Sequence, residues 1–105
     1  MFLLGGIGIP IRVAACATQS AGVYTLRESY GAASLNKTAT GLVEVLFNVT
    51  MAGTNYIVCT GSESGSVIVT VSTKSTTKVL LDIRNSTTGA NLDNGFNVMI
   101  IGATA

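Results

Sequence analysis

Hydrophobic and polar residues alternate with a period of two in four runs of the chain, at 41–48, 66–72, 78–84 and 96–101. Successive side chains of a β-strand point to opposite faces of its sheet, so this period predicts strands with one face in a core. The residues expected to point inward are Val43, Val45 and Phe47; Val67, Val69 and Val71; Val79, Leu81 and Ile83; and Phe96, Val98 and Ile100.

The side of these runs that faces away from the expected core is also unusually apolar. Leu42 and Leu46 flank Glu44 in the first run, and Met99 and Ile101 share the outer side of the last. Only 10% of the 105 residues are charged, against about 25% in an average soluble protein. Charged side chains keep the surface of a lone domain wet, so we expect other subunits to cover Leu42, Leu46, Met99 and Ile101. The sequence therefore favours a homo-oligomer.

Three earlier segments, at 9–17, 23–30 and 55–60, show weaker versions of the same pattern and are rich in β-branched residues. Turn-forming clusters with a glycine at or near the bend separate the runs at 38–41, 62–65, 87–91 and 93–95. A short helical turn fits only within 29–37, and no stretch has helical periodicity with caps. The sequence predicts an all-β fold, an antiparallel β-sandwich of about seven strands.

One domain is expected, because halves of a 105-residue chain would be too small to bury a useful core. We divide the chain into an apolar lead-in at 1–10 and a sandwich at 11–105. The lead-in has no basic n-region, is too short to cross a bilayer, and contains three glycines and a proline. We expect no membrane insertion. The lead-in is interpreted as the cut edge of a longer polypeptide or as a strand that packs on a neighbouring subunit.

The sequence offers little catalytic chemistry. Histidine is absent, which removes the commonest general base near neutral pH and the most frequent metal ligand. A zinc site would have to combine both cysteines with two carboxylates, a poor set for this metal. Lys and Arg are spread along the chain without a block, so we expect no nucleic-acid partner. We expect no cofactor and no enzymatic activity, with a paired-carboxylate glycoside hydrolase as the enzymatic alternative.

Cys16 and Cys59 do not decide between an oxidising and a reducing compartment for this protein. Each lies in an apolar run, and the two could bridge neighbouring strands. A free cysteine is itself among the residues most often buried. Two free, buried cysteines are therefore the favoured interpretation, with a disulfide as the alternative.

Four segments of strand and turn residues follow one another in a distinctive order. They are R-E-S-Y-G at 27–31, T-A-T-G-L-V-E-V-L-F at 38–47, N-V-T-M-A-G-T-N-Y-I-V at 48–58 and F-N-V-M-I-I-G at 96–102. This order resembles the distal domain of bacteriophage tail-fibre and related receptor-binding proteins. The resemblance implies a small antiparallel β domain at the end of a fibre, usually a homotrimer, that contacts a host surface structure. The residues before Pro10 depart from it, because they are not elongated fibrous repeats.

These observations favour a non-enzymatic virion protein, a tail-fibre tip or receptor-binding domain that acts by multivalent contact with a host-cell glycan or protein. The alternative is a structural virion protein, such as a capsid decoration or tail-assembly subunit, that binds only other virion proteins. Both interpretations place the protein in the virion. We expect the contacts to come from turns at one end of the sandwich. The polar candidates are Asn36, Lys37, Asn85, Asn91, Asp93 and Asn94.

Overall fold

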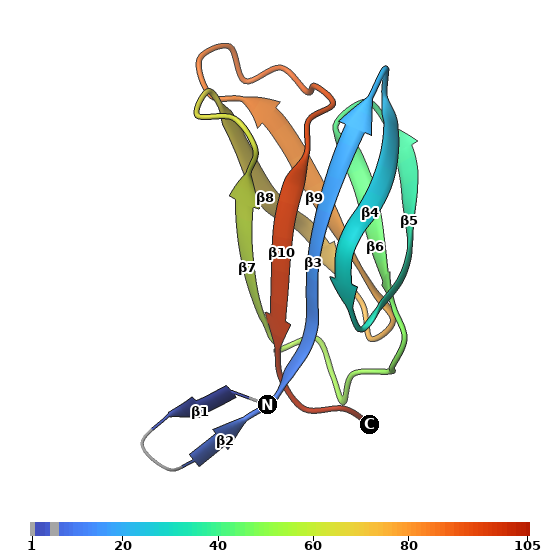
Figure 1. The fold of residues 1–105 in the computed structure, drawn as a ribbon, viewed down its shortest axis with the longest axis vertical. Coiled ribbons are helices and arrows are strands. Elements are labelled where there is room, and N and C mark those ends of the chain that lie inside the picture. The colour runs from blue at the N-terminus through green and yellow to red at the C-terminus, as the bar shows by residue number, and fades with distance from the viewer. Residues whose placement is uncertain (1, 5–6) are drawn as a thin grey trace.

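The computed structural model describes residues 2–4 and 7–105, and every regular element in these residues is a β-strand (Figure 1). The strands are β1 (Phe2–Leu4), β2 (Ile7–Ile9), β3 (Ile11–Ser20), β4 (Val23–Tyr30), β5 (Ala32–Ala39), β6 (Leu42–Phe47), β7 (Ile57–Ser62), β8 (Val67–Lys74), β9 (Lys78–Asn85) and β10 (Phe96–Ile101).

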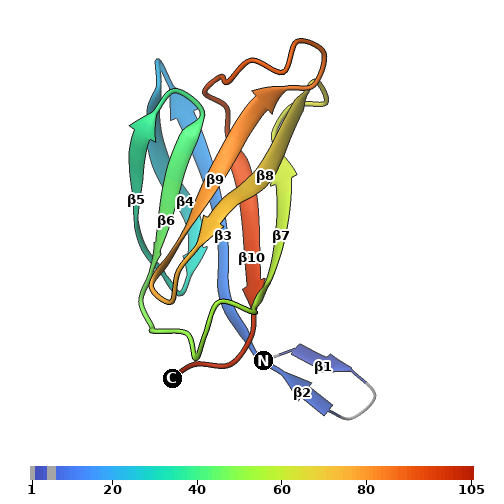
Figure 2. The same cartoon turned by 180° about the vertical axis from the view of Figure 1, so that it is seen from behind.

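Eight of these strands form two antiparallel sheets of four that pack face to face (Figures 1 and 2). The first sheet has the strand order β4-β3-β10-β7, and the second has the order β5-β6-β9-β8. In the lead-in, β1 and β2 pair with each other, with Phe2 opposite Ile9. The expected all-β antiparallel sandwich is confirmed, with eight strands in its two sheets where the sequence indicated about seven.

The additional strand is β5, in the region where the sequence left room for a short helical turn. Its sequence, A-A-S-L-N-K-T-A, contains one large apolar residue, Leu35, so it has no visible alternation. β5 is an edge strand that pairs only with β6. Such a strand can form with little apolar surface because its neighbour supplies the hydrogen-bonding partners. Residues 29–37 therefore belong to β4, β5 and the glycine between them, and the helical turn is wrong.

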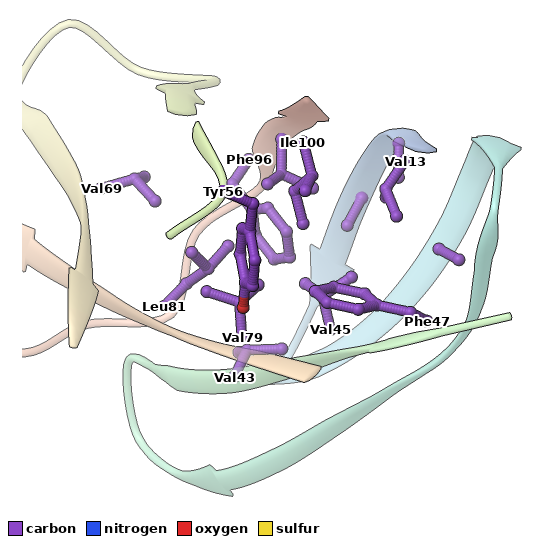
Figure 3. Packing of buried hydrophobic residues seen from close by; sticks show 14 of the residues in the cluster. Val13, Val43, Val45, Phe47, Tyr56, Val69, Val79, Leu81, Phe96 and Ile100 are labelled. Atoms are coloured by element: carbon purple, nitrogen blue, oxygen red, sulfur yellow. The ribbon is translucent and has the colours of Figure 1, made fainter. Parts of the chain in front are cut away.

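The inner faces of the two sheets form the core (Figure 3). All the inward-facing residues predicted in β6, β9 and β10 are buried. In β8, Val69 is buried, while Val67 and Val71 are half-buried and pack against the core. Among the residues whose side chains are described, no polar or charged residue is fully buried. The alternation in the sequence therefore identifies the core correctly.

Two aromatic pairs lie toward opposite ends of this core. The ring centroids of Tyr24 and Phe96 are 5.9 Å apart where β10 begins, and Phe47 meets Tyr56 edge to face at 5.8 Å where β6 ends. Tyr56 donates a hydrogen bond from its hydroxyl to the carbonyl of Ser75 at 2.8 Å. The only polar atom of this buried side chain is therefore satisfied.

Cys16 and Cys59 are free, as the sequence favoured. They lie on β3 and β7, the two strands that flank β10 in the first sheet. Cys16 is half-buried, and burial together with a hydrogen bond donated to Glu63 raises the pKa of its thiol. Cys59 is exposed, so the expectation that both cysteines are buried is wrong. Apolar neighbours in the sequence do not decide which face of a strand a residue occupies.

Gly31 is the single residue that carries the chain from β4 in the first sheet to β5 in the second. Its φ is +77°, a conformation that residues with a side chain rarely adopt. A Cβ at this position would also collide with the carbonyl oxygen of Arg12 on β3. This one-residue connection between the sheets therefore requires glycine, which has no side chain.

Replacing Gly31 with alanine is expected to lower the free energy of unfolding by about 2 kcal/mol or more, because backbone strain and a collision combine. Urea unfolding followed by circular dichroism measures this difference. Gly53→Ala is the matched control, because no atom beyond the two adjacent residues lies within 4 Å of a Cβ at that position. Equal stability of the two variants would contradict the role assigned to Gly31.

Candidate binding surface at the loop end

Four connections of the sandwich gather at one end, which we call the loop end. They are the β3–β4 turn at 21–22, the β5–β6 turn at 40–41, the β7–β8 turn at 63–66 and the long β9–β10 connection at 86–95 (Figure 1). The C-terminal residue and the start of β3 lie at the opposite end, which we call the base. The loop end is therefore the part of the sandwich farthest from where the chain enters and leaves it.

Asp93 organises the loop end through hydrogen bonds from three separate elements. Its Oδ2 accepts a hydrogen bond from Lys37 Nζ of β5 at 2.7 Å. Its Oδ1 accepts from the Gly41 backbone N–H at 3.0 Å and from the Tyr24 hydroxyl of β4 at 3.3 Å. Lys37 also donates to the carbonyl of Gly22 at 3.2 Å. One carboxylate thus ties the β9–β10 connection to both edge strands on one side of the sandwich.

The protonation states of this network follow from its surroundings. Burial alone raises the pKa of Asp93, but the hydrogen bonds from Lys37 and Gly41 outweigh it and hold the pKa below its ordinary value of 3.8. Burial raises the pKa of Tyr24 to about 12, and the adjacent carboxylate of Asp93 adds to this effect. At neutral pH, Asp93 is therefore ionised, and Tyr24 keeps the proton that it donates.

Asn85 and Asn91 fold the β9–β10 connection itself. Asn85 Oδ1 accepts hydrogen bonds from the backbone N–H groups of Thr87 and Thr88, at 2.8 and 3.0 Å. Asn91 donates from Nδ2 to Asp82 Oδ1 at 2.7 Å and to the carbonyl of Ile83 at 3.1 Å. Both asparagine side chains therefore stabilise the conformation of this connection through hydrogen bonds within the chain.

Asn94 and Asn36 complete the set of predicted ligand contacts. Asn94 lies beside the Asp93 network, and its backbone N–H donates to the Tyr24 hydroxyl at 3.1 Å. Asn36 lies on β5 and donates to Glu44 Oε1 at 2.7 Å across the second sheet. The structure brings Lys37, Asn85, Asn91, Asp93 and Asn94 together at the loop end and places Asn36 on a sheet face.

A hollow of about 210 Å³ opens beside Asn94. The residues lining it are Thr18, Gln19, Glu63, Asn94 and Gly95. It exists because the strands of the first sheet differ in length: β10 begins at Phe96, opposite Ala17, whereas β3 continues to Ser20. The last residues of β3 therefore have no β10 partner beside them, and the β7–β8 turn closes the other side.

Gly95 allows the walls of this hollow to come close together. A Cβ on Gly95 would lie 2.6 Å from Glu63 Cγ and 2.8 Å from the carbonyl oxygen of Ala17. Sequence reasoning identified Asn94 but missed Thr18, Gln19 and Glu63. The only signal for them is polar: Thr18 and Gln19 follow the apolar run at 13–17, and Glu63 is the one charge in its turn.

A second hollow, of about 260 Å³, lies at the base. Its lining residues are Ala52, Gly53, Asn55, Tyr56, Gly102 and Ala103. Small side chains dominate this lining, and no charged residue is among them. The base hollow therefore lacks a charged side chain such as Glu63, which lines the hollow at the loop end.

The four residues predicted to form an oligomer interface are divided between the two outer faces of the sandwich. Leu42 and Leu46 lie on the outer face of β6, whereas Met99 and Ile101 lie on the outer face of β10. All four are half-buried within the single chain. A single flat contact between two copies therefore cannot cover all four residues.

The two outer faces differ in polarity. Near Leu42 and Leu46, the second sheet carries two ion pairs, Lys78–Glu44 at 2.7 Å and Arg84–Asp82 at 3.0 Å. In the first sheet, Met99 lies between Ala14 and Cys59, and Ile101 lies opposite Ile57, which is 58% exposed. The outer face of β10 is thus the more apolar of the two.

Other indications of function are few. Nowhere in residues 2–4 and 7–105 do three or more His, Cys, Asp or Glu side chains come together in a way that could hold a metal ion. In the same residues, no helix is long and apolar enough to cross a membrane. Comparisons with protein-family models, curated proteins and solved structures give no match to this chain.

Replacing Asp93 with asparagine removes the charge but little volume, and we expect the free energy of unfolding at pH 7 to fall by about 1–3 kcal/mol. Because the folded-state pKa of Asp93 lies below the ordinary value, its stabilisation is complete above that value and is lost as the pH falls through the folded-state pKa. Urea unfolding from pH 7 to pH 3 should therefore show the difference between the two proteins shrinking in acid.

The exposed Glu28 provides the control for this experiment, because Glu28→Gln removes an acid outside the network. Asp82 and Glu44 also have lowered pKa values, owing to Arg84 and Lys78, so all variants keep some acid sensitivity. A constant stability difference between Asp93→Asn and the unchanged protein over the whole pH range would refute the network's assigned electrostatics.

Proposed function

We propose that this protein is a bacteriophage tail-fibre tip or receptor-binding domain that contacts the host surface through its loop end. The observation that carries the proposal is the gathering of four connections, five predicted polar residues and a polar hollow at the end farthest from the base. A module attached to a fibre through its base would direct this end outward. The order of strand and turn segments that resembles tail-fibre distal domains supports the same function.

We further propose that the protein assembles as a homotrimer in the virion. In a ring of three, each subunit presents two different surfaces to its neighbours, whereas a twofold dimer buries one surface twice. A ring could therefore cover Leu42 and Leu46 on one face together with Met99 and Ile101 on the other. Three linked copies would also strengthen weak contacts at each loop end by multivalency.

The proposed function has no catalytic step, and the placement of the acids supports this. A glycoside hydrolase needs two carboxyl groups that face each other across the sugar bond. Asp82, Asp93 and Glu44 are each paired with a basic side chain. Glu63 is the only acid among the residues that line the loop-end hollow. The binding function is thus a better fit to this surface than hydrolysis.

Retention on host cells tests the binding function. Fluorescently labelled protein should be retained by at least one strain in a panel of bacteria. Ala90→Arg, which places a bulky charge on an exposed residue of the β9–β10 connection, should reduce that retention at least tenfold. Ala103→Arg, the matched change at the base, should leave it unchanged. Absence of retention on every strain would refute the adhesin function and favour the structural virion protein.

Light scattering tests the oligomer. The expected mass is about three times the 10.7 kDa of one chain. Met99→Asp and Leu42→Asp should each shift the mass toward the monomer, because an unpaired carboxylate would be buried in the interface. Arg27→Gln, a change at an exposed position of β4, is the control. A mass near 10.7 kDa for the unchanged protein would overturn the trimer.

A further inference from the structure

The loop-end hollow contains two side-chain amides whose orientation is set by the backbone. Gln19 Oε1 accepts a hydrogen bond from the Gly22 N–H at 3.1 Å, and Asn94 Oδ1 accepts from the Gly95 N–H at 2.8 Å. With both carbonyl oxygens engaged, each amide presents its NH₂ group as the remaining donor. Neither nitrogen donates a hydrogen bond to any described residue of the chain. Two residues that line the hollow thus keep a free NH₂ group.

Glu63 supplies the complementary acceptor. It takes part in none of the ion pairs found in the described chain. Within the described residues, the only hydrogen-bond partner of its carboxylate is the Cys16 thiol, a weak donor at 3.6 Å. Thr18 adds a hydroxyl whose oxygen accepts from Arg27 Nε at 3.0 Å, which leaves the hydroxyl hydrogen to be donated. The lining residues therefore carry two amides, a hydroxyl and one carboxylate.

We propose that this hollow binds one pyranose unit of a surface glycan through vicinal hydroxyl groups. A carboxylate can accept hydrogen bonds from two neighbouring hydroxyls, and the amides can donate to hydroxyl or ring oxygens. This assignment rests on the proposed function, because it names the chemistry by which the loop end contacts a host.

Two features of the hollow narrow the class of ligand. Its volume of about 210 Å³ is below the roughly 300–1,000 Å³ of sites for drug-sized ligands, so it suits a single ring. No Lys or Arg is among its lining residues, which disfavours phosphate or sulfate. A primary amine would pair with Glu63 but leave the amides of Gln19 and Asn94 without acceptors, so a neutral polyhydroxyl ligand satisfies more of the lining.

The site has no aromatic residue in its lining. Stacking of a sugar ring on an aromatic face therefore cannot add to the hydrogen bonds. We expect binding of one unit to be weak, with a dissociation constant on the order of 1 mM. Multivalent presentation would make such a site effective on a cell surface.

Nuclear magnetic resonance tests the site with the methyl pyranosides of glucose, galactose and mannose as probes. At least one should give a saturation-transfer signal and shift the side-chain NH₂ resonances of Gln19 and Asn94 in the unchanged protein. Glu63→Gln should weaken that binding at least fivefold, because a neutral amide is a poorer acceptor than a carboxylate. Glu28→Gln, on β4 outside the hollow, should leave it unchanged.

The outcomes separate this site from the proposed function. If no pyranoside binds and cells still retain Glu63→Gln as they retain the unchanged protein, the sugar site is wrong and host contact stands. If a pyranoside binds and Glu63→Gln weakens it while no strain retains the protein, the sugar site stands and host contact is wrong. Pyranoside binding that leaves the Gln19 and Asn94 NH₂ resonances unmoved would place the sugar elsewhere and overturn the inference.

Discussion

The packing of two sheets through their inner faces is the constraint on which the rest of this molecule depends. The core between them is built from Val, Leu, Ile, Phe and a few Ala side chains together with Met51 and Tyr56, and no described polar residue is fully buried there. Its stabilisation comes from removing apolar surface from water. Because neighbouring residues of a strand face opposite ways, every second residue of a strand points into this core. The residues between them lie on the outer faces. Charged side chains accordingly lie on the outer faces of the strands and in the connections.

Much of the fold could be predicted from the sequence, because hydrophobic and polar residues alternate along most of the strands that form the core. The alternation predicts the bounds of β6, β8, β9 and β10 to within two residues at each end. β5 could not be found in this way, since an edge strand with Leu35 as its only large apolar residue carries no periodic signal. No local pattern reveals that Gly31 alone connects the two sheets. A side chain is excluded there by the backbone of Arg12, which is far away in the sequence.

Less of the candidate site could be predicted. Asn and Asp residues in turns suggested ligand contacts, yet Asn85, Asn91 and Asp93 form hydrogen bonds that shape the connections themselves. The hollow beside Asn94 arises from a difference in length between β3 and β10. Such a difference depends on pairing between distant segments. Thr18, Gln19 and Glu63 therefore meet for reasons that no short stretch of sequence contains.

Because of the same difference in strand length, the side chains around the hollow take no part in the packing of the core. The side chains of Thr18, Gln19, Glu63 and Asn94 belong neither to the buried cluster nor to the apolar residues packed against it. Exchanges at these positions alter the shape and polarity of the hollow without removing apolar contacts between the sheets. The scaffold can thus accept many different side chains around the hollow without a change in its architecture.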